Sequence, residues 1–398
     1  MSGDHKGIDG PGIGLGGMPG RMAQALGAGG LGEAPGWLPL VALSRRTFMS
    51  GLGALTLTAC APGSPFTDGG AHGQGAKGAF ALLPLSGSAA AIGQDMARAM
   101  SLAASGLTLP EALDAGDTAE AAGEAAKSAM AGHARLILGP LRADQVPGVV
   151  ALAGPVPVLT FSNDESLAGS GAFIFGVTPA QSVATMFSYA KAQGATRVAL
   201  VAAETPFGRS SAVAAQAIAA AGGMHLAATL LRDPAKPGVV SALRTASGGV
   251  MPEAVFLPDR GAALQSFARG LRGAGVQIMG STQWGLGADA QALTNPDLDG
   301  AWFAAPPPDQ FQPFADKFEA AFGTTPGFVA ALGYDAALVA LDLGRSGAMS
   351  RKGLLRAQGF SGALGRFRFQ ADGRCTRDLS VLGLRNGEIT ALGEVSGT

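Results

Sequence analysis

Side chains that commonly catalyse reactions or bind metals are few in this sequence and lie far apart. The four histidines, His5, His72, His133 and His225, are not spaced as metal ligands are. HExxH, CxxC, Walker A and GxSxG sequences are absent. A catalytic site built from distant loops is recognised by geometry, so the sequence leaves that alternative open. We expect no enzyme, no metal and no cofactor.

Charged side chains suited to binding follow several apolar segments. Asp144, Asp164 and Glu204 would hold either the ammonium group of a ligand or solvent. Arg142 could pair directly with a carboxylate or phosphate, or it could be a solvated surface arginine. These residues favour recognition of a small polar solute over catalysis.

The segment before residue 60 has the features of a secretory signal. Arg45 and Arg46 precede a short apolar stretch at 49–59 and then Cys60. The order of residues resembles twin-arginine export signals, and the sequence LTAC that ends at Cys60 resembles the lipobox of bacterial lipoproteins. Ala61 follows the cysteine, which by this resemblance favours the outer over the inner membrane. The alternative is an amphipathic N-terminal helix with a buried Cys60.

Composition excludes several other classes of protein. The 398 residues are 47% hydrophobic and 14% charged, which excludes a disordered chain. Because 28 basic residues stand against 29 acidic ones, the chain lacks the positive charge that general nucleic-acid binding needs. Mean hydropathy is +0.27, yet no apolar run reaches the roughly 18 residues of a spanning helix. Removing 59 of the 398 residues as a signal leaves 339, enough for two lobes.

Apolar segments of strand length alternate with segments of helix length after a Gly- and Pro-rich tether at 60–77. Strands are expected at 78–85, 136–138, 156–161, 197–202, 227–231, 254–257, 277–279 and 301–304, and helices at 89–105 and 210–221. Short, continuously apolar strands separated by helices indicate parallel sheets covered on both faces. The sequence therefore predicts an α/β doubly wound architecture that occurs twice.

Several segments carry a resemblance to a known family. They are Phe80 to Gly87, Ala91 to Met96, Ile137 to Pro140, Pro155 to Leu159, Glu204 to Arg209, and Phe318 to Ala336. Together they resemble type I periplasmic binding proteins of the leucine/isoleucine/valine-binding class. The similarity covers nearly all of 77–398 and depends on the order and spacing of the segments.

The resemblance implies two Rossmann-like lobes joined by three crossings of the chain and closing on a small molecule by a hinge motion. Lobe 1 is expected at 78–178 and 308–346, and lobe 2 at 179–307 and 347–398. The implied function is that of a non-enzymatic, lipid-anchored receptor for an amino acid or similar solute, with an ABC-type permease as partner. It acts in the periplasm without a cofactor.

Ligands of open α/β sheets bind beyond the carboxyl ends of the strands, so the loops there contain the candidate ligand-binding residues. These are Ser86, Leu141, Arg142, Phe161, Ser162, Asn163, Glu204, Phe207 and Trp284. Amino-acid binders of the class generally place small hydroxyl residues in both first-lobe loops, whereas this chain has GPLRAD at 139–144 and SNDES at 162–166. Phe207 could pack either on ligand or in the core.

A second resemblance supports an alternative function. The sequences LPLSG at 83–87 and GPLR at 139–142 also resemble the C-terminal domain of penicillin-binding protein activators, lipoproteins that stimulate a peptidoglycan synthase. Those proteins are best known with an additional helical-repeat domain, and no such domain fits between Cys60 and Gly78.

The C-terminal segment predicts a β-hairpin. Phe367 and Phe369 alternate with Arg366 and Arg368, a turn signal follows at 372–373, and 374–384 again has strand character. The phenylalanines should face the core, and the arginines should face a partner, lipid headgroups or solvent. Cys375 should be a small buried hydrophobe, although a reactive thiol is the alternative.

Overall fold

The computed structural model describes residues 75–285 and 294–397. Arg45, Arg46 and Cys60, together with the expected signal and most of the expected tether, lie outside the described residues. In the part that is described, no helix combines the length and the apolar character needed to cross a membrane.

The first sheet is entirely parallel. Its strands, in spatial order, are β2 (Glu111–Asp114), β1 (Ala79–Leu83), β3 (Leu136–Leu138), β4 (Val158–Thr160) and β5 (Phe173–Ile174). Residues of β1, β3, β4 and β5 are all buried, which explains their continuous apolar sequences. The chain order reverses between β1 and β3, the position at which doubly wound sheets bind ligands.

The second sheet repeats this strand order and extends it. From one edge it contains β7 (His225–Leu231), β6 (Arg197–Ala202), β8 (Ala254–Leu257), β9 (Gln277–Gly280), β10 (Trp302–Ala305), β14 (Leu379–Arg385) and β15 (Glu388–Val395). The strands from β7 to β10 are parallel, whereas β14 and β15 are antiparallel additions. The predicted pair of α/β doubly wound sheets is confirmed.

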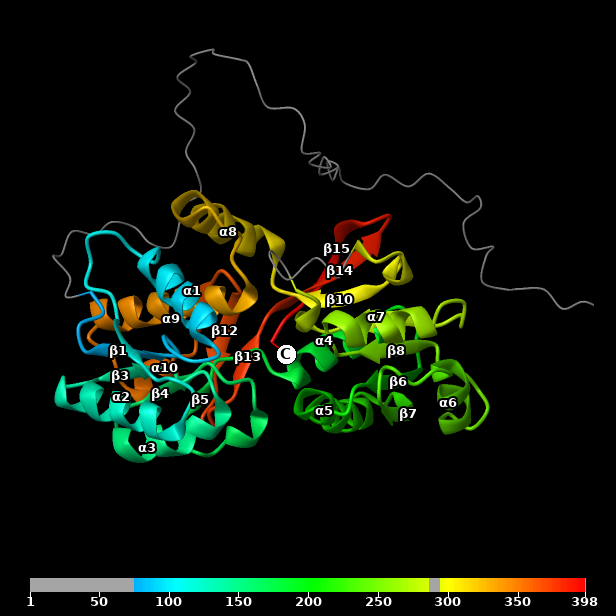
Figure 1. Cartoon of the computed structure of the whole chain (residues 1–398), viewed down its shortest axis with the longest axis horizontal. Coiled ribbons are helices and arrows are strands. Elements are labelled where there is room, and N and C mark those ends of the chain that lie inside the picture. The colour runs from blue at the N-terminus through cyan, green and yellow to red at the C-terminus, as the bar shows by residue number, and fades with distance from the viewer. Residues whose placement is uncertain (1–74, 286–293, 398) are drawn as a thin grey trace, which may run out of the picture. The chain divides into compact units, whose positions relative to one another are not determined.

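Helices cover both faces of each sheet. Figure 1 shows α1 (Ala90–Ser101) and α9 (Phe328–Arg345) together, with α2 (Ala119–Ala131) and α3 (Val146–Ala153) on the opposite side of the first sheet. In the second sheet, α4 (Pro179–Ala192) and α5 (Pro206–Gly222) pack on one face, and α6 (Val239–Ala246) and α7 (Gly261–Gly270) on the other. The remaining helices are α8 (Pro308–Phe322) and the short α10 (Arg351–Leu354).

The predicted hairpin is present as β12 (Gly365–Phe369) and β13 (Cys375–Arg377), with β11 (Phe360–Gly362) as a third antiparallel strand. Phe367 and Phe369 are buried and Arg366 and Arg368 exposed, as expected from their alternation. The strand predicted over 374–384 is interrupted at Asp378, because β13 pairs with β12 whereas β14 joins the second sheet. One apolar stretch therefore contributes to two sheets.

A buried ion pair fastens this hairpin to α9. Asp335 and Arg377 are both fully buried, with 3.8 Å between Oδ2 and Nη1. The carboxylate also accepts hydrogen bonds from the amides of Ala363 and Leu364, and the guanidinium lies over the ring of Phe367. Burial raises the pKa of Asp335 to about 6, against the opposing effect of Arg377.

The chain passes between the two sheets after β5, after β10 and after β13. The small sheet β11–β13 contacts the first sheet through its aromatic side chains, since Phe369 lies 5.4 Å from Phe173 and Phe367 5.0 Å from Phe175, centroid to centroid. We propose the expected lobe boundaries with one adjustment, namely that β11–β13 belong with lobe 1 and β14 and β15 with lobe 2.

Candidate functional site

A cavity of about 610 Å³ lies among loops that follow strands of both sheets. Leu141 follows β3 and Ser162 follows β4, while Thr205 follows β6, Asp259 follows β8 and Gln283 follows β9. Every one of these loops leaves the carboxyl end of a parallel strand, where the doubly wound topology places ligands. The volume is that of a site for a small molecule.

The start of α5 forms one wall of the cavity. Thr205 caps this helix by accepting a hydrogen bond from the amide of Gly208 at 3.0 Å. A side chain at Gly208 would overlap the carbonyl oxygen of Ala203, so the glycine lets the helix begin directly against the end of β6. Phe207, in the first turn, is thereby held at the cavity.

Asp259 is the most buried charged residue of the cavity lining, with 8% of its surface exposed. Its Oδ2 accepts a hydrogen bond from the amide of Ala203 at 2.9 Å. Burial raises the pKa of this carboxyl, and hydrogen bonds from the backbone oppose the rise. Within the described residues Asp259 forms no salt bridge. A cationic group in the cavity would therefore stabilise its charged form.

The next residue supplies the opposite charge. Arg260 lines the cavity, is exposed, and occupies the N-cap position of α7 without a side-chain cap. The first amides of a helix attract anions, and an uncapped end leaves them available. A carboxylate at Asp259 beside a guanidinium and a helix start at Arg260 is suited to a ligand that carries both charges.

Four of the predicted site residues line this cavity. Leu141, Ser162 and Asn163 come from the first sheet, and Phe207 comes from the second. Ser162 also accepts a hydrogen bond from the amide of Asp164, which fixes the loop after β4. The structure brings these four residues together, and their contact with a ligand stays a prediction.

Two predicted residues are core residues next to the cavity. Phe161 is 2% exposed and packs against Phe175, with 6.4 Å between ring centroids. Trp284 is fully buried, stacks on Phe303, and donates its indole N–H to the carbonyl of Leu257 at 3.0 Å. Neither residue belongs to the lining of the cavity.

Three more predicted residues are exposed and also lie outside the cavity lining. Arg142 pairs with Asp144, with 3.3 Å between Nε and Oδ1, in agreement with the alternative of a solvated arginine. Glu204 accepts a hydrogen bond on its carbonyl from Arg209. Ser86 donates its amide to Oδ1 of Asp114 at 3.1 Å, so its loop is held to the end of β2.

Asp259, Arg260 and Gln283 also line the cavity but are not among the ligand-binding residues predicted from the sequence. Asp259 and Arg260 directly follow the strand predicted at 254–257. Ligands bind beyond the carboxyl ends of such strands, so the sequence pattern indicates this loop as well as the others. Which residues of a loop point inward depends on backbone geometry, which the spacing of apolar residues does not reveal.

A family model described as "Periplasmic binding protein" matches residues 81–388. The chain belongs to the periplasmic binding protein family. This membership confirms the resemblance and confirms the expectation of a binding protein rather than an enzyme. Among residues 75–285 and 294–397, no three His, Cys, Asp or Glu side chains are grouped so as to hold a metal ion.

Solved structures establish the fold of this binding protein independently. A putative branched-chain amino acid ABC transporter protein from Rhodospirillum rubrum matches with a TM-score of 0.69 and 21% identity, over 79% of this chain and 99% of its own. A solute-binding protein of R. palustris in complex with benzoate matches with a TM-score of 0.58 and 19% identity, over 80% of this chain and 96% of its own. LivJ of Streptococcus pneumoniae in complex with isoleucine matches with a TM-score of 0.58 and 18% identity, over 80% of this chain and 98% of its own. A search of curated proteins found no match.

Proposed function

We propose that this chain is the periplasmic receptor of an ABC-type transporter and binds a small polar solute in the cavity between its two sheets. The observation that carries the proposal is the cavity itself, lined from the carboxyl ends of strands in both sheets. A ligand that touches both groups of loops stabilises the arrangement in which they approach each other. This geometry supports binding by hinge closure.

The lining favours a ligand with an ammonium group and a carboxylate. Asp259 and Asp164 would hold the ammonium group, while Arg260 and the start of α7 would hold the carboxylate. Leu141 and Phe207 would contact an apolar side chain. An amino acid meets all three requirements, and the isoleucine in the complex of LivJ is of this class.

An aromatic acid is the second ligand class to include in a test. The R. palustris protein is similar to this chain and was solved with benzoate. Benzoate has no ammonium group, so it would leave the buried carboxylate of Asp259 without a cation. We therefore propose amino acids ahead of aromatic acids.

We further propose that the mature protein is anchored to the periplasmic side of the outer membrane by lipid on Cys60. The support is the sequence LTAC that ends at Cys60, after Arg45 and Arg46 and a short apolar stretch. A lipid on the first mature residue would hold the binding domain near the bilayer.

Isothermal titration calorimetry of the full chain against a panel of amino acids and benzoates tests the function. At least one amino acid should give saturable heat with one site per chain, and benzoate should bind more weakly. A panel without heat or thermal shift for any member would count against solute binding. Activation of a peptidoglycan synthase is the remaining hypothesis, and the described residues show no feature that favours it.

A further inference from the structure

Positive charge is concentrated in one stretch of this nearly neutral chain. Residues 345–385 contain nine Arg and Lys against two Asp, whereas the whole chain has 28 basic and 29 acidic residues. The rest of the chain is therefore clearly acidic. This asymmetry is not explained by solute binding, because none of these nine residues lines the cavity.

Part of this charge lies beside the first described residues. A Cβ on Gly344, near the end of α9, would overlap the carbonyl oxygen of Gly75, so the two backbones are in close contact. Arg135 bridges the same region, since its amide bonds to the carbonyl of Gly78 at 2.7 Å and its Nη2 lies 3.5 Å from the carbonyl of Gly347. The first described residues therefore pack against the end of α9.

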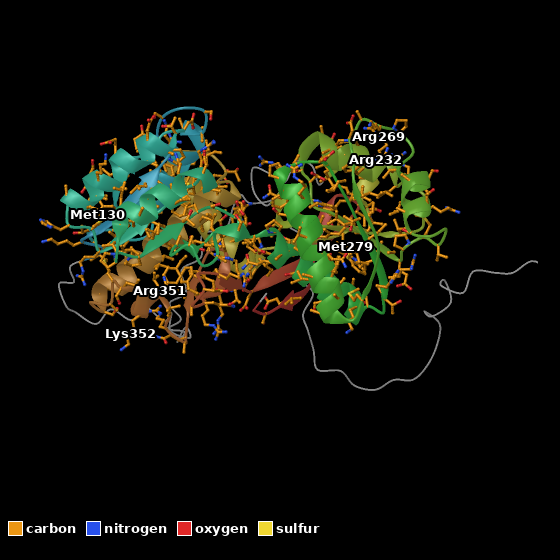
Figure 2. The ribbon with its side chains drawn as sticks, turned by 90° about the horizontal axis from the view of Figure 1, so that it is seen from below. Met130, Arg232, Arg269, Met279, Arg351 and Lys352 are labelled. Carbon is orange, nitrogen blue, oxygen red and sulfur yellow. The ribbon has the colours of Figure 1, made fainter. Side chains whose placement is uncertain are left out.

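Five exposed basic residues lie beside these contacts or at the start of α10, which follows α9 in the chain, and we call them the basic cluster. They are Lys77, Arg135, Arg345, Arg351 and Lys352. The last two begin α10, and Figure 2 shows them close together at the same edge of the ribbon.

The charge of the basic cluster is not neutralised within the described residues. None of its members forms a salt bridge there. Arg351 is held by neutral groups, namely the carbonyl of Ala371 at 2.7 Å and the ring of Phe173, whose centroid lies 4.6 Å from Cζ. Asp342, at the end of α9, pairs with Arg356 instead.

We propose that the basic cluster docks this protein on anionic phospholipid headgroups. Phosphate oxygens of lipids would pair with its guanidinium and ammonium groups, and several such residues together bind an anionic bilayer measurably. The chain from Cys60 to Gly75 spans at most about 50 Å when fully extended, so a lipid on Cys60 would keep the cluster near the bilayer. That second argument depends on the proposed lipidation, whereas the charge argument does not.

The test measures co-sedimentation of the full chain carrying Cys60→Ser with phosphatidylcholine vesicles that contain or lack phosphatidylglycerol. Cys60→Ser prevents lipidation, so a failure of the proposed anchor does not affect the result. The readout is the ratio of binding to the two vesicle types, because apolar insertion of the signal would contribute to both.

The cluster variant is Arg345→Gln/Lys352→Gln, whose side chains are exposed and make no hydrogen bond or ion pair in the described structure. The matched control is Arg244→Gln/Lys236→Gln, on α6 and on the loop that precedes it. It also removes one exposed lysine and one arginine from the last turn of a helix. Unchanged thermal melting and unchanged solute binding would show that both variants are folded.

We expect the parent chain to prefer phosphatidylglycerol vesicles, and the preference to fall as salt is added. The cluster variant should lose about fivefold per charge removed, or about 25-fold at low salt, while the control stays close to the parent. The proposal is overturned if the parent shows no preference, or if the two variants behave alike. Full preference in the cluster variant would also overturn it and would point to another partner, such as an acidic protein segment.

Discussion

At the scale of single residues, Asp259 is the strongest indicator of what the cavity binds. Its carboxyl group is nearly buried, bonded on one oxygen by the amide of Ala203, and without a salt bridge within the described residues. A buried carboxylate is costly unless a cation or further donors compensate. A bound ammonium group would supply that compensation.

The binding of an amino acid should therefore weaken as the solution is made acidic, beginning at a higher pH than an ordinary aspartate would cause. Burial raises the pKa of Asp259, so this carboxyl takes up a proton at a higher pH than an ordinary aspartate and then attracts an ammonium group less. Calorimetric titrations at a series of pH values would measure the affinity. Asp259→Asn should bind more weakly at pH 7 and lose most of the pH dependence; an unchanged pH profile in that variant would assign the effect elsewhere.

Cys375 should be inert in the folded protein. It is buried, and burial raises the pKa of its thiol to about 11, so the reactive thiolate is scarce near neutral pH. In the chain carrying Cys60→Ser it is the one remaining thiol. Iodoacetamide at pH 8 should label it slowly when native and rapidly in denaturant; fast labelling of the native chain would contradict the burial.

What a side chain contacts was harder to predict from the sequence than whether the residue lies at the end of a strand. Leu141, Ser162, Asn163 and Phe207 lie at a common cavity, and their loops could be predicted because the ends of parallel strands follow apolar segments. Trp284 shows why other predicted residues do not line the cavity. Its position after a strand suggested a ligand contact, yet its ring fills the space beside Gly280, which no sequence pattern reveals.

At the scale of elements, the buried strands were predicted best. The strands expected at 136–138, 197–202 and 254–257 have the bounds found in the structure, since continuous apolar sequence is enforced by burial on both faces. Strand β2 was missed because it is an edge strand whose residues are mostly exposed. The division of 374–384 between two sheets was missed because strand pairing is a tertiary property.

The position of α5 depends on Gly208. A methyl group there would overlap the carbonyl oxygen of Ala203, so Gly208→Ala should move the helix start, destabilise the protein by about 1–3 kcal/mol and weaken solute binding. Gly222→Ala, in the last turn of the same helix, meets no atom within 4 Å and should be neutral or slightly stabilising. Urea unfolding measures both; equal effects of the two variants would mean that Gly208 has no packing role.

At the scale of the whole molecule, two sheets with the same core strand order contribute loops to one cavity, and the expected anchor lies in a separate part of the chain. The two-sheet architecture was predictable because the α/β pattern repeats. The grouping of β11–β13 beside the first sheet was not, because it depends on contacts between phenylalanines far apart in sequence.

Export and anchoring should depend on three residues of the predicted signal. Cys60→Ser should abolish labelling by a fatty acid, and Arg45→Lys/Arg46→Lys should prevent export through the twin-arginine route. Cell fractionation and metabolic labelling with a fatty acid measure the two effects. Fatty-acid labelling that persists in Cys60→Ser would refute the proposed anchor without bearing on the cavity.

The most direct test of solute binding in the cavity compares Asp259→Asn with Asp316→Asn, an exposed aspartate on α8 away from the cavity lining. Isothermal titration with the best amino acid from the panel is the measurement. We predict that Asp259→Asn lowers affinity at pH 7 by at least about tenfold, because a charged hydrogen bond to the ligand is worth about 1.5–3 kcal/mol, and that Asp316→Asn binds like the parent chain. Equal affinity of all three proteins would contradict the account.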